Sequence, residues 1–143
     1  MNSHKTAIVR KTLSAPAKFL VKNGLIKGRV LDYGCGRGND ADTLGFDKYD
    51  PYFFPSPPSC DSKYDTIVCN YVLNTLPKEQ WQTVIDSIST LLSAEGRAYI
   101  SVRNDRKDLN GFTSKGTYQT LVELDLPIVA KNGNFIMYLL RKD

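Results

Sequence analysis

Four residues near the start of the sequence have the types and spacing of a ligand-binding turn. A short apolar run leads to Asp32, and Gly34, Gly36 and Gly38 follow at every second position. This pattern predicts a buried parallel strand that ends at Asp32 and turns sharply into a helix, because glycine adopts backbone conformations that side chains forbid. Bare backbone at such a turn lets an adenosine-containing ligand approach closely in a doubly wound α/β domain. The glycine spacing is not the dinucleotide spacing G-x-G-x-x-G, which disfavours a nicotinamide-dependent oxidoreductase.

A second acidic residue fits the same kind of ligand. An adenosine ligand needs a carboxylate that accepts hydrogen bonds from both ribose hydroxyls, at the end of the second strand and about 20 residues beyond the glycines. Asp50 is our choice, because Pro51 ends the strand directly after it. Asp47 is the alternative, since it lies two residues earlier and therefore on the same face of a strand.

The elements that must position these residues follow from the hydrophobic pattern. In the first half of the chain we expect helices over 14–23 and 39–44 and strands over 29–33, 46–50 and 64–70. The segment 51–59 contains four prolines and cannot form a regular helix. The usual third strand is therefore missing or reduced to a few residues around Cys60.

The second half of the chain completes the sheet. We expect helices over 78–92 and 117–124, a strand over 97–102, and a closing hairpin formed by 128–130 and 134–140. Trp81 belongs to the apolar face of the helix over 78–92 and is expected in the core. The fold class is α/β: a Rossmann-like doubly wound sheet of about six strands, mostly parallel, with an antiparallel last strand and a reduced third-strand region.

Length and composition narrow the class of protein. The 143 residues, 41% of them hydrophobic, predict a single domain over 1–143 in which 1–28 form a basic arm and a helix. No apolar run reaches 18 residues, and no secretion signal is recognisable, so we expect no membrane association. The three cysteines have no metal-type spacing, which favours reduced thiols, a cytoplasmic location and no metal site. The sequence gives no indication of an oligomeric state.

Charge is distributed unevenly along the chain. The net charge is +4, yet the first 29 residues contain seven basic residues and no acidic ones, while the remainder has 12 basic and 15 acidic residues. A basic arm of this kind could attract a nucleic acid or a nucleotide. The alternative is a basic helix face that is simply solvated.

The glycine motif and two later segments resemble a known enzyme family. Residues 31–38 are similar to motif I of the class I S-adenosylmethionine-dependent methyltransferases, and 65–76 and 91–100 are similar to the segments around their fourth and fifth strands. A narrower resemblance, to the DNA-phosphorothioation-associated methyltransferases, rests on five pieces of sequence: 4–7, 31–38, 49–52, 70–74 and 116–119.

The resemblance implies that S-adenosyl-L-methionine is the cofactor and suggests which residues bind it. Asp50 would take the ribose, and Asp61 would contact the adenine amino group. Asn70 and Tyr71 would lie beside the cofactor, although a strand-end cap is the alternative role for Asn70. The methionyl part would be held by the side chain of Asp32 and by the backbone of Gly34, Cys35 and Gly36.

The sequence does not identify the catalytic residue. The candidates are His4, Asn70 and Tyr71; His4 would act as a general base if the arm folded over the pocket, and is otherwise exposed. Neither the Asn/Asp-Pro-Pro-Tyr motif of amino-nitrogen DNA methylation nor a Pro-Cys nucleophile follows the strand over 64–70. We expect a methyltransferase that acts on a nucleic acid or nucleotide. The alternatives are a small-metabolite methyltransferase and a domain that binds the cofactor or its product without catalysis.

Overall fold

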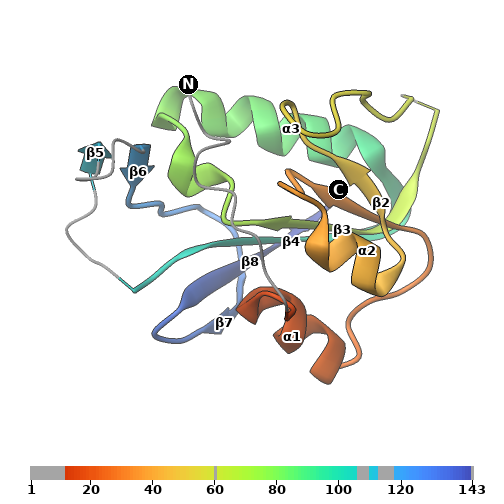
Figure 1. The fold of residues 1–143 in the computed structure, drawn as a ribbon, viewed down its shortest axis with the longest axis horizontal. Helices are drawn as coiled ribbons and strands as arrows, with labels where there is room; N and C mark the ends of the chain where they lie inside the picture. Colours follow the sequence, from red (N-terminus) through yellow and green to blue (C-terminus); the bar gives the residue numbers. More distant parts are fainter. Residues whose placement is uncertain (1–11, 60, 106–109, 113–117, 143) are drawn as a thin grey trace.

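Six strands form one mixed sheet in the computed structural model (Figure 1), which describes residues 12–59, 61–105, 110–112 and 118–142. These strands are β1 (Val30–Tyr33), β2 (Asp47–Tyr49), β3 (Tyr64–Asn70), β4 (Leu92–Arg103), β7 (Ile128–Lys131) and β8 (Phe135–Arg141). Their order across the sheet is β2-β1-β3-β4-β8-β7, with the first four strands parallel and β8 antiparallel to β4. The predicted α/β sheet with an antiparallel last strand is therefore confirmed.

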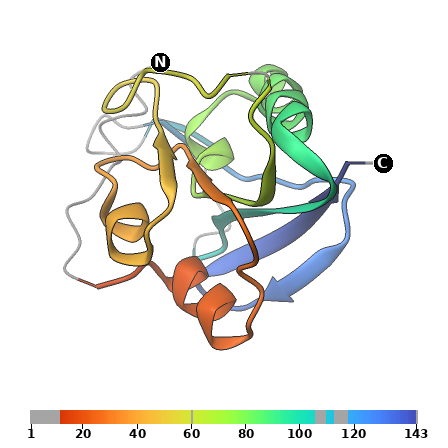
Figure 2. The ribbon, with the colours of Figure 1, turned by 90° about the vertical axis from the view of Figure 1, so that its right-hand side faces the viewer.

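Alternation along the strands sends apolar side chains to both faces of the sheet. On β3, Ile67 and Cys69 join the larger core, which packs against α3 (Trp81–Leu91). Val68 points to the opposite face, where it belongs to the same core cluster as Leu20 of α1 (Ala15–Lys22). Figures 1 and 2 show α3 on one side of the sheet and α1 on the other. Because helices or loops cover both faces of the sheet, a ligand site is expected at the ends of the strands.

Helix α1 begins as the sequence predicts and is tied to α2 (Asn39–Leu44). Ser14 is its N-cap, and the hydroxyl oxygen accepts a hydrogen bond from the backbone N–H of Ala17 at 3.3 Å. The same hydroxyl donates to Asp40 Oδ2 at 2.6 Å, and the Ser14 backbone N–H donates to Asp40 Oδ1 at 3.0 Å. These bonds fix the start of α1 beside the first turn of α2, next to the glycine motif.

The reduced third-strand region is confirmed for the residues that the structure describes. Between β2 and β3 the described chain contains no strand, only an isolated bridge between Asp50 and Phe54. Cys60, around which a remnant strand was expected, lies outside the described residues. Strand β2 consequently stands at the edge of the sheet.

Helix α3 starts three residues later than expected, after a separate 3-10 turn, η3 (Lys78–Gln80). A further 3-10 turn, η2 (Leu73–Thr75), follows β3. Trp81 is in the core as predicted, 7% exposed, and its indole N–H donates to the carbonyl oxygens of Leu73 and Leu76, both at 3.0 Å. No helix in the described ranges is long and apolar enough to cross a membrane.

The helix expected over 117–124 is wrong. Residues Tyr118–Thr120 form strand β6, which pairs antiparallel with β5 (Asn110–Phe112) in a small second sheet. The extended backbone sends the Gln119 side chain to Asn74 and leaves Val122 1% exposed in the larger core. Tertiary contacts thus override a weak helical pattern at this position. The hairpin of β7 and β8 forms as predicted, with the Asn132 side chain accepting hydrogen bonds from the backbone N–H groups of Asn134 and Phe135.

Candidate functional site

A cavity of about 670 Å³ opens at the carboxyl ends of β1 and β3. Its volume lies in the range of small-molecule and cofactor sites. Strand β1 has β2 on one side and β3 on the other, so the strand order reverses here, and ligands of open α/β sheets bind at such a switch point. Seven of the residues predicted to bind the cofactor line this cavity: Asp32, Gly34, Cys35, Gly36, Asp50, Asn70 and Tyr71.

The glycine turn forms one wall of the cavity. Gly34 has a φ of +80°, and a Cβ atom added to it would collide with the Val72 side chain. Gly36, with a φ of +58°, also adopts the left-handed conformation that favours glycine. The backbone N–H groups of Gly34 and Cys35 donate to the carbonyl oxygen of Tyr49 at 2.7 and 3.0 Å, which holds the turn against the end of β2.

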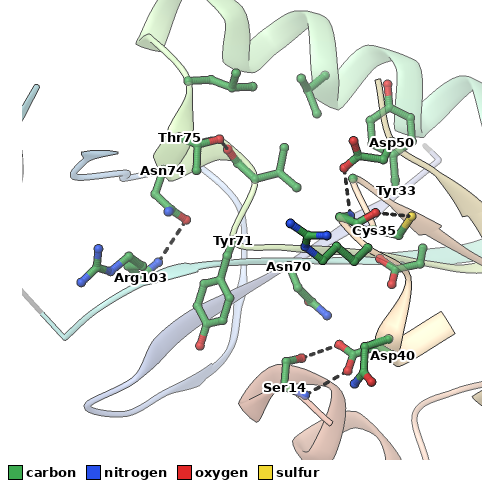
Figure 3. Close-up of a pocket in the computed structure, with 18 of the residues that line it drawn as sticks. Ser14, Tyr33, Cys35, Asp40, Asp50, Asn70, Tyr71, Asn74, Thr75 and Arg103 are labelled. Atoms are coloured by element: carbon green, nitrogen blue, oxygen red, sulfur yellow. Dashed lines mark hydrogen bonds between the residues drawn. The ribbon is translucent and has the colours of Figure 1, made fainter. Parts of the chain in front are cut away.

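The carboxylate of Asp50 binds the glycine turn directly (Figure 3). Its Oδ2 atom accepts a hydrogen bond from the Gly36 N–H at 2.9 Å, and Oδ1 accepts from the N–H groups of Tyr52 and Phe53 at 2.9 and 3.2 Å. A carboxylate has about four lone-pair sites, so Oδ2 can still accept from a ligand. The alternative residue, Asp47, accepts from the Tyr64 hydroxyl at 2.8 Å instead and does not line the cavity.

Asp32 is buried at the floor of the cavity, only 4% exposed. Burial, followed by the negative charges of Asp40 and Asp50, raises the pKa of its carboxyl group to about 8. A nearby cation would lower that pKa again and favour the carboxylate. The site therefore has an acidic end that suits a positively charged ligand group.

Asn70 contributes a buried side-chain amide to the same wall. Among the described residues neither its Nδ2 nor its Oδ1 atom has a hydrogen-bond partner, although both atoms are buried. Ser101, its neighbour in register on β4, likewise has a buried hydroxyl without a partner. Unpaired buried polar groups are costly, so this arrangement fits a ligand that completes the bonds of Asn70. The expected alternative, a strand-end cap formed by Asn70, is not seen among the described contacts.

Tyr71 is held in a strained backbone conformation. Its φ is +63°, a left-handed value that no other described residue except glycine adopts. The Tyr71 N–H donates to the carbonyl oxygen of Ser101 at 2.8 Å, which holds the backbone in this conformation. Strain of this kind concentrates at functional sites. Here it turns the chain out of β3 and places Tyr71 in the middle of the cavity lining (Figure 3).

The far end of the cavity is polar and was missed by the sequence analysis. Asn74 is 1% exposed and Gln119 is 5% exposed, and Asn74 Nδ2 donates to Gln119 Oε1 at 2.9 Å. Arg103, at the end of β4, donates from Nε and Nη2 to the two carboxylate oxygens of Asp105, both at 2.8 Å. This pairing raises the pKa of the Arg103 guanidinium. These side chains come from η2, β4 and β6, and no local sequence pattern connects them.

Three other predicted residues are Asp61, His4 and Cys35. Asp61 does not line the cavity, so the structure does not bring it to the other predicted residues. His4, the candidate general base, lies outside the described residues. Burial, followed by the charges of Asp32 and Asp50, raises the pKa of the Cys35 thiol to about 12. That thiol is therefore protonated at neutral pH and unsuited to nucleophilic attack.

Comparisons with known proteins agree with this geometry. The solved structure of TehB from Haemophilus influenzae has a TM-score of 0.63 at 18% identity, over 94% of this chain and 64% of that one. The TehB-like S-adenosylmethionine-dependent methyltransferase from Corynebacterium glutamicum has a TM-score of 0.55 at 19% identity. The match covers 89% of this chain and 87% of that one. A third structure is Burkholderia thailandensis 1,6-didemethyltoxoflavin-N1-methyltransferase, solved with 1,6-didemethyltoxoflavin and S-adenosylhomocysteine. Its TM-score is 0.56 at 19% identity, and the match covers 87% of this chain and 76% of that one. At these identities the likeness shows the fold.

The chain is shorter than some of the proteins that it matches. It spans 49% and 64% of the length of two of the solved structures. Among curated proteins the comparison gives no match. A family model described as a methyltransferase domain matches residues 6–120, which is most of the chain. The chain therefore belongs to this family of methyltransferase domains.

Proposed function

We propose that this domain transfers a methyl group from S-adenosylmethionine to an acceptor bound in the same cavity. The observation that carries the proposal is the convergence of the glycine turn, Asp32, Asp50 and the unpaired Asn70 amide on one cavity at the switch point of the sheet. Each of these groups fits a part of the cofactor. The glycine turn offers bare backbone, Asp32 a carboxylate for the ammonium group, Asp50 a carboxylate for the ribose hydroxyls, and Asn70 an amide that can form hydrogen bonds. The family membership supports the same activity.

The cofactor supplies an electrophilic methyl group on a sulfonium centre, which needs little further activation. The protein then has to orient the acceptor and exclude competing water. Asp32 would hold the methionyl ammonium group, and Asp50 would hold the ribose. Tyr71, placed between these residues and the far end of the cavity, would separate the cofactor from the acceptor. His4, Asn70 and Tyr71 stay the candidates for a catalytic residue.

A nucleic acid or nucleotide is the acceptor class that the charge distribution favours. Four basic residues of the acid-free N-terminal part are described by the structure, namely Lys18, Lys22, Lys27 and Arg29. The narrower resemblance to the DNA-phosphorothioation-associated methyltransferases supports the same class. Lys5, Arg10 and Lys11, which complete the basic arm, lie outside the described residues.

A small metabolite is the second candidate, and the cavity itself favours it. The buried amides of Asn74 and Gln119 lie within the cavity lining, where a compact acceptor would reach them. The Burkholderia thailandensis enzyme, whose structure holds 1,6-didemethyltoxoflavin, provides an example of a small acceptor on this fold. A domain that binds the cofactor without catalysis is the third candidate. A cytoplasmic location is also part of our proposal, because Cys35 and Cys69 are free thiols.

Calorimetric titration with S-adenosylmethionine, S-adenosylhomocysteine and NAD tests the cofactor assignment. We expect the first two to bind and NAD not to bind. Binding of NAD alone would overturn the proposed function. Binding of the cofactor without methyl transfer to any nucleotide, nucleic acid or metabolite pool would favour the non-catalytic alternative.

Salt dependence tests the acceptor class. Binding to short DNA or RNA should weaken steeply as salt rises, because phosphate contacts release counterions. Changing Arg10, Lys11 and Lys18 together to glutamate should reduce this binding and leave cofactor binding unchanged. Absence of detectable binding at low salt would remove the nucleic-acid proposal and leave a small acceptor.

A further inference from the structure

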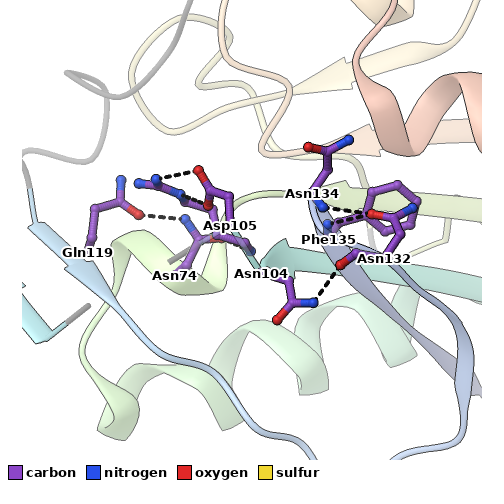
Figure 4. A network of polar contacts seen from close by, with 8 residues as sticks. Asn74, Asn104, Asp105, Gln119, Asn132, Asn134 and Phe135 are labelled. Atoms are coloured by element: carbon purple, nitrogen blue, oxygen red, sulfur yellow. Dashed lines mark hydrogen bonds and ion pairs between the residues drawn. The ribbon is translucent and has the colours of Figure 1, made fainter. Parts of the chain in front are cut away.

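The hydrogen bonds at the far end of the cavity fix the orientation of two side-chain amides. The backbone N–H of Arg103 can only donate, and it donates to Asn74 Oδ1 at 3.4 Å. Asn74 must therefore present Nδ2 to Gln119, where it donates to Oε1 at 2.9 Å. Gln119 is left with Nε2, an amide donor for which the described residues provide no acceptor (Figure 4). This side chain is 95% buried and lines the cavity, so its free donor has a ligand-accessible position.

The guanidinium of Arg103 adds further donors to the same end of the cavity, since Arg103 and Gln119 both line it and both bond to Asn74. Two of its five N–H groups donate to Asp105, and the part of the chain that the structure describes provides no acceptor for the other three. The paired bonds to Asp105 fix the plane of the guanidinium, while the Arg103 side chain keeps 24% of its surface exposed at the cavity wall. A planar guanidinium that is held in place is suited to bind a carboxylate or a phosphate through two parallel bonds.

The two ends of the cavity differ in charge and hydrogen-bonding character. Asp32, Asp40 and Asp50 line the end near the glycine turn. In the close-up, Arg103 and Asn74 lie on the opposite side of Tyr71 from Asp50 and Cys35 (Figure 3). Three carboxyl groups and one arginine, Arg37, line the end near the glycine turn, which suits a cation. The far end offers amide and guanidinium donors, and its one carboxylate, Asp105, is already paired with Arg103.

We propose that Gln119 Nε2 and the Arg103 guanidinium bind an oxyanion, a phosphate or a carboxylate, on the methyl acceptor. The inference rests on the proposed function, since it concerns the acceptor half of the same cavity. It predicts that the acceptor is an acid: a nucleotide if the oxyanion is phosphate, or an acidic small metabolite if it is carboxylate. Asp105 is a positioning residue here, because it acts through Arg103.

The test is a nuclear magnetic resonance titration of ¹⁵N-labelled protein saturated with S-adenosylhomocysteine. Inorganic phosphate and acetate are added in separate series, with sodium chloride at matched ionic strength as the reference. We expect saturable shifts of the Gln119 side-chain amide and the Arg103 Nε–H signals with one or both anions. A preference for phosphate indicates a nucleotide-like acceptor, and a preference for acetate indicates a carboxylic acid. Shifts equal to those with chloride would overturn the inference.

Two variants and a matched control show which groups bind the anion. Gln119→Glu keeps an oxygen that accepts from Asn74, replaces the amide donor by an acceptor and adds a negative charge, so the dissociation constant of the anion should rise at least tenfold. Arg103→Lys keeps the charge but loses the planar fork, and should also weaken binding. Gln80→Glu makes the same chemical change on the exposed surface of η3 and should leave binding unchanged. The backbone amide spectrum confirms that each variant is folded; unchanged binding in folded Gln119→Glu contradicts the proposal.

Calorimetry with S-adenosylhomocysteine keeps this inference separate from the proposed function. Cofactor binding without a response to either anion would overturn the oxyanion site alone. A specific anion response without cofactor binding, measured on the ligand-free protein, would overturn the methyltransferase proposal alone.

Discussion

The two ends of the cavity are built in different ways. The end near the glycine turn takes most of its lining from residues 32–51, with Asn70 and Tyr71 added from the end of β3, and its bond between Gly36 and Asp50 spans 14 residues. The far end joins Asn74 to Gln119, 45 residues apart, and Asn74 to Arg103, 29 residues apart. The far end therefore depends on the packing of three distant elements, whereas most of the other end lies within one stretch of the chain. Under our proposal, the far end is the half that binds the acceptor.

The largest effect is expected at the glycine turn. Gly36→Val places a branched side chain where φ is +58° and where the ligand would approach, so cofactor binding should be lost. Calorimetric titration with S-adenosylhomocysteine measures the effect, and circular dichroism checks the fold. Gly133→Val is the control, because an added Cβ atom there meets nothing within 4 Å. Binding by Gly36→Val that equals binding by the control would show that the ligand does not approach this backbone.

The next largest effect is expected at the end of β2. Asp50→Ala leaves three backbone N–H groups without their acceptor and removes the proposed ribose ligand. Cofactor binding should weaken by about 1–3 kcal/mol, which is roughly a 5- to 150-fold change in the dissociation constant. Asp47→Ala is the matched control, because Asp47 begins β2, the strand that ends directly before Asp50, and lies outside the cavity. Equal losses in the two variants would mean that the effect comes from the strand and not from the site.

A substitution at the far end of the cavity should lower methyl transfer without changing cofactor affinity. Asn74→Ala leaves the Arg103 N–H and Gln119 Oε1 without their partner, which should reduce the free energy of unfolding by about 1–3 kcal/mol. Methyl transfer should fall, while affinity for S-adenosylhomocysteine should stay within about twofold of the parent value, a difference of roughly 0.4 kcal/mol. Urea unfolding and calorimetry give the two measurements. A large loss of cofactor affinity would show that the two ends are not independent.

The last prediction is a pH dependence of the free energy of unfolding that arises from Asp32. Its pKa is raised to about 8 in the folded protein, so the folded state holds a proton that the unfolded state loses above about pH 4. The free energy of unfolding should therefore fall as pH rises towards 8, by about 1.4 kcal/mol per pH unit at most, and this contribution should be constant above that pH. Urea unfolding between pH 5 and pH 9 measures the slope. Asp32→Asn should flatten it, and an unchanged slope would assign the effect to other groups.

Much of the cofactor end could be predicted from the sequence because local residue types determine it. Asp32, Gly34, Gly36 and Asp50 follow one another over a short stretch, and the structure places all four at the same cavity. The far end could not be predicted, because a strand of three residues has too little periodicity to distinguish it from a helix. The mistaken helix over 117–124 hid Gln119, whose role depends on contact with Asn74. Asp61 does not line the cavity, and the described segment between β2 and β3 lacks a strand that would position it there.

The short connection between β2 and β3 also affects how the sheet avoids self-association. Among the described residues no further strand pairs with β2, so the backbone of that strand is open on one side and could pair with another chain. Three features limit this hazard: β2 has only three residues, it carries a lysine at position 48, and the chain folds back on it through the paired bonds between Asp50 and Phe54. The opposite edge, β7, is also short and ends in Lys131. Both borders of the sheet are thus protected against edge-to-edge aggregation without a covering helix.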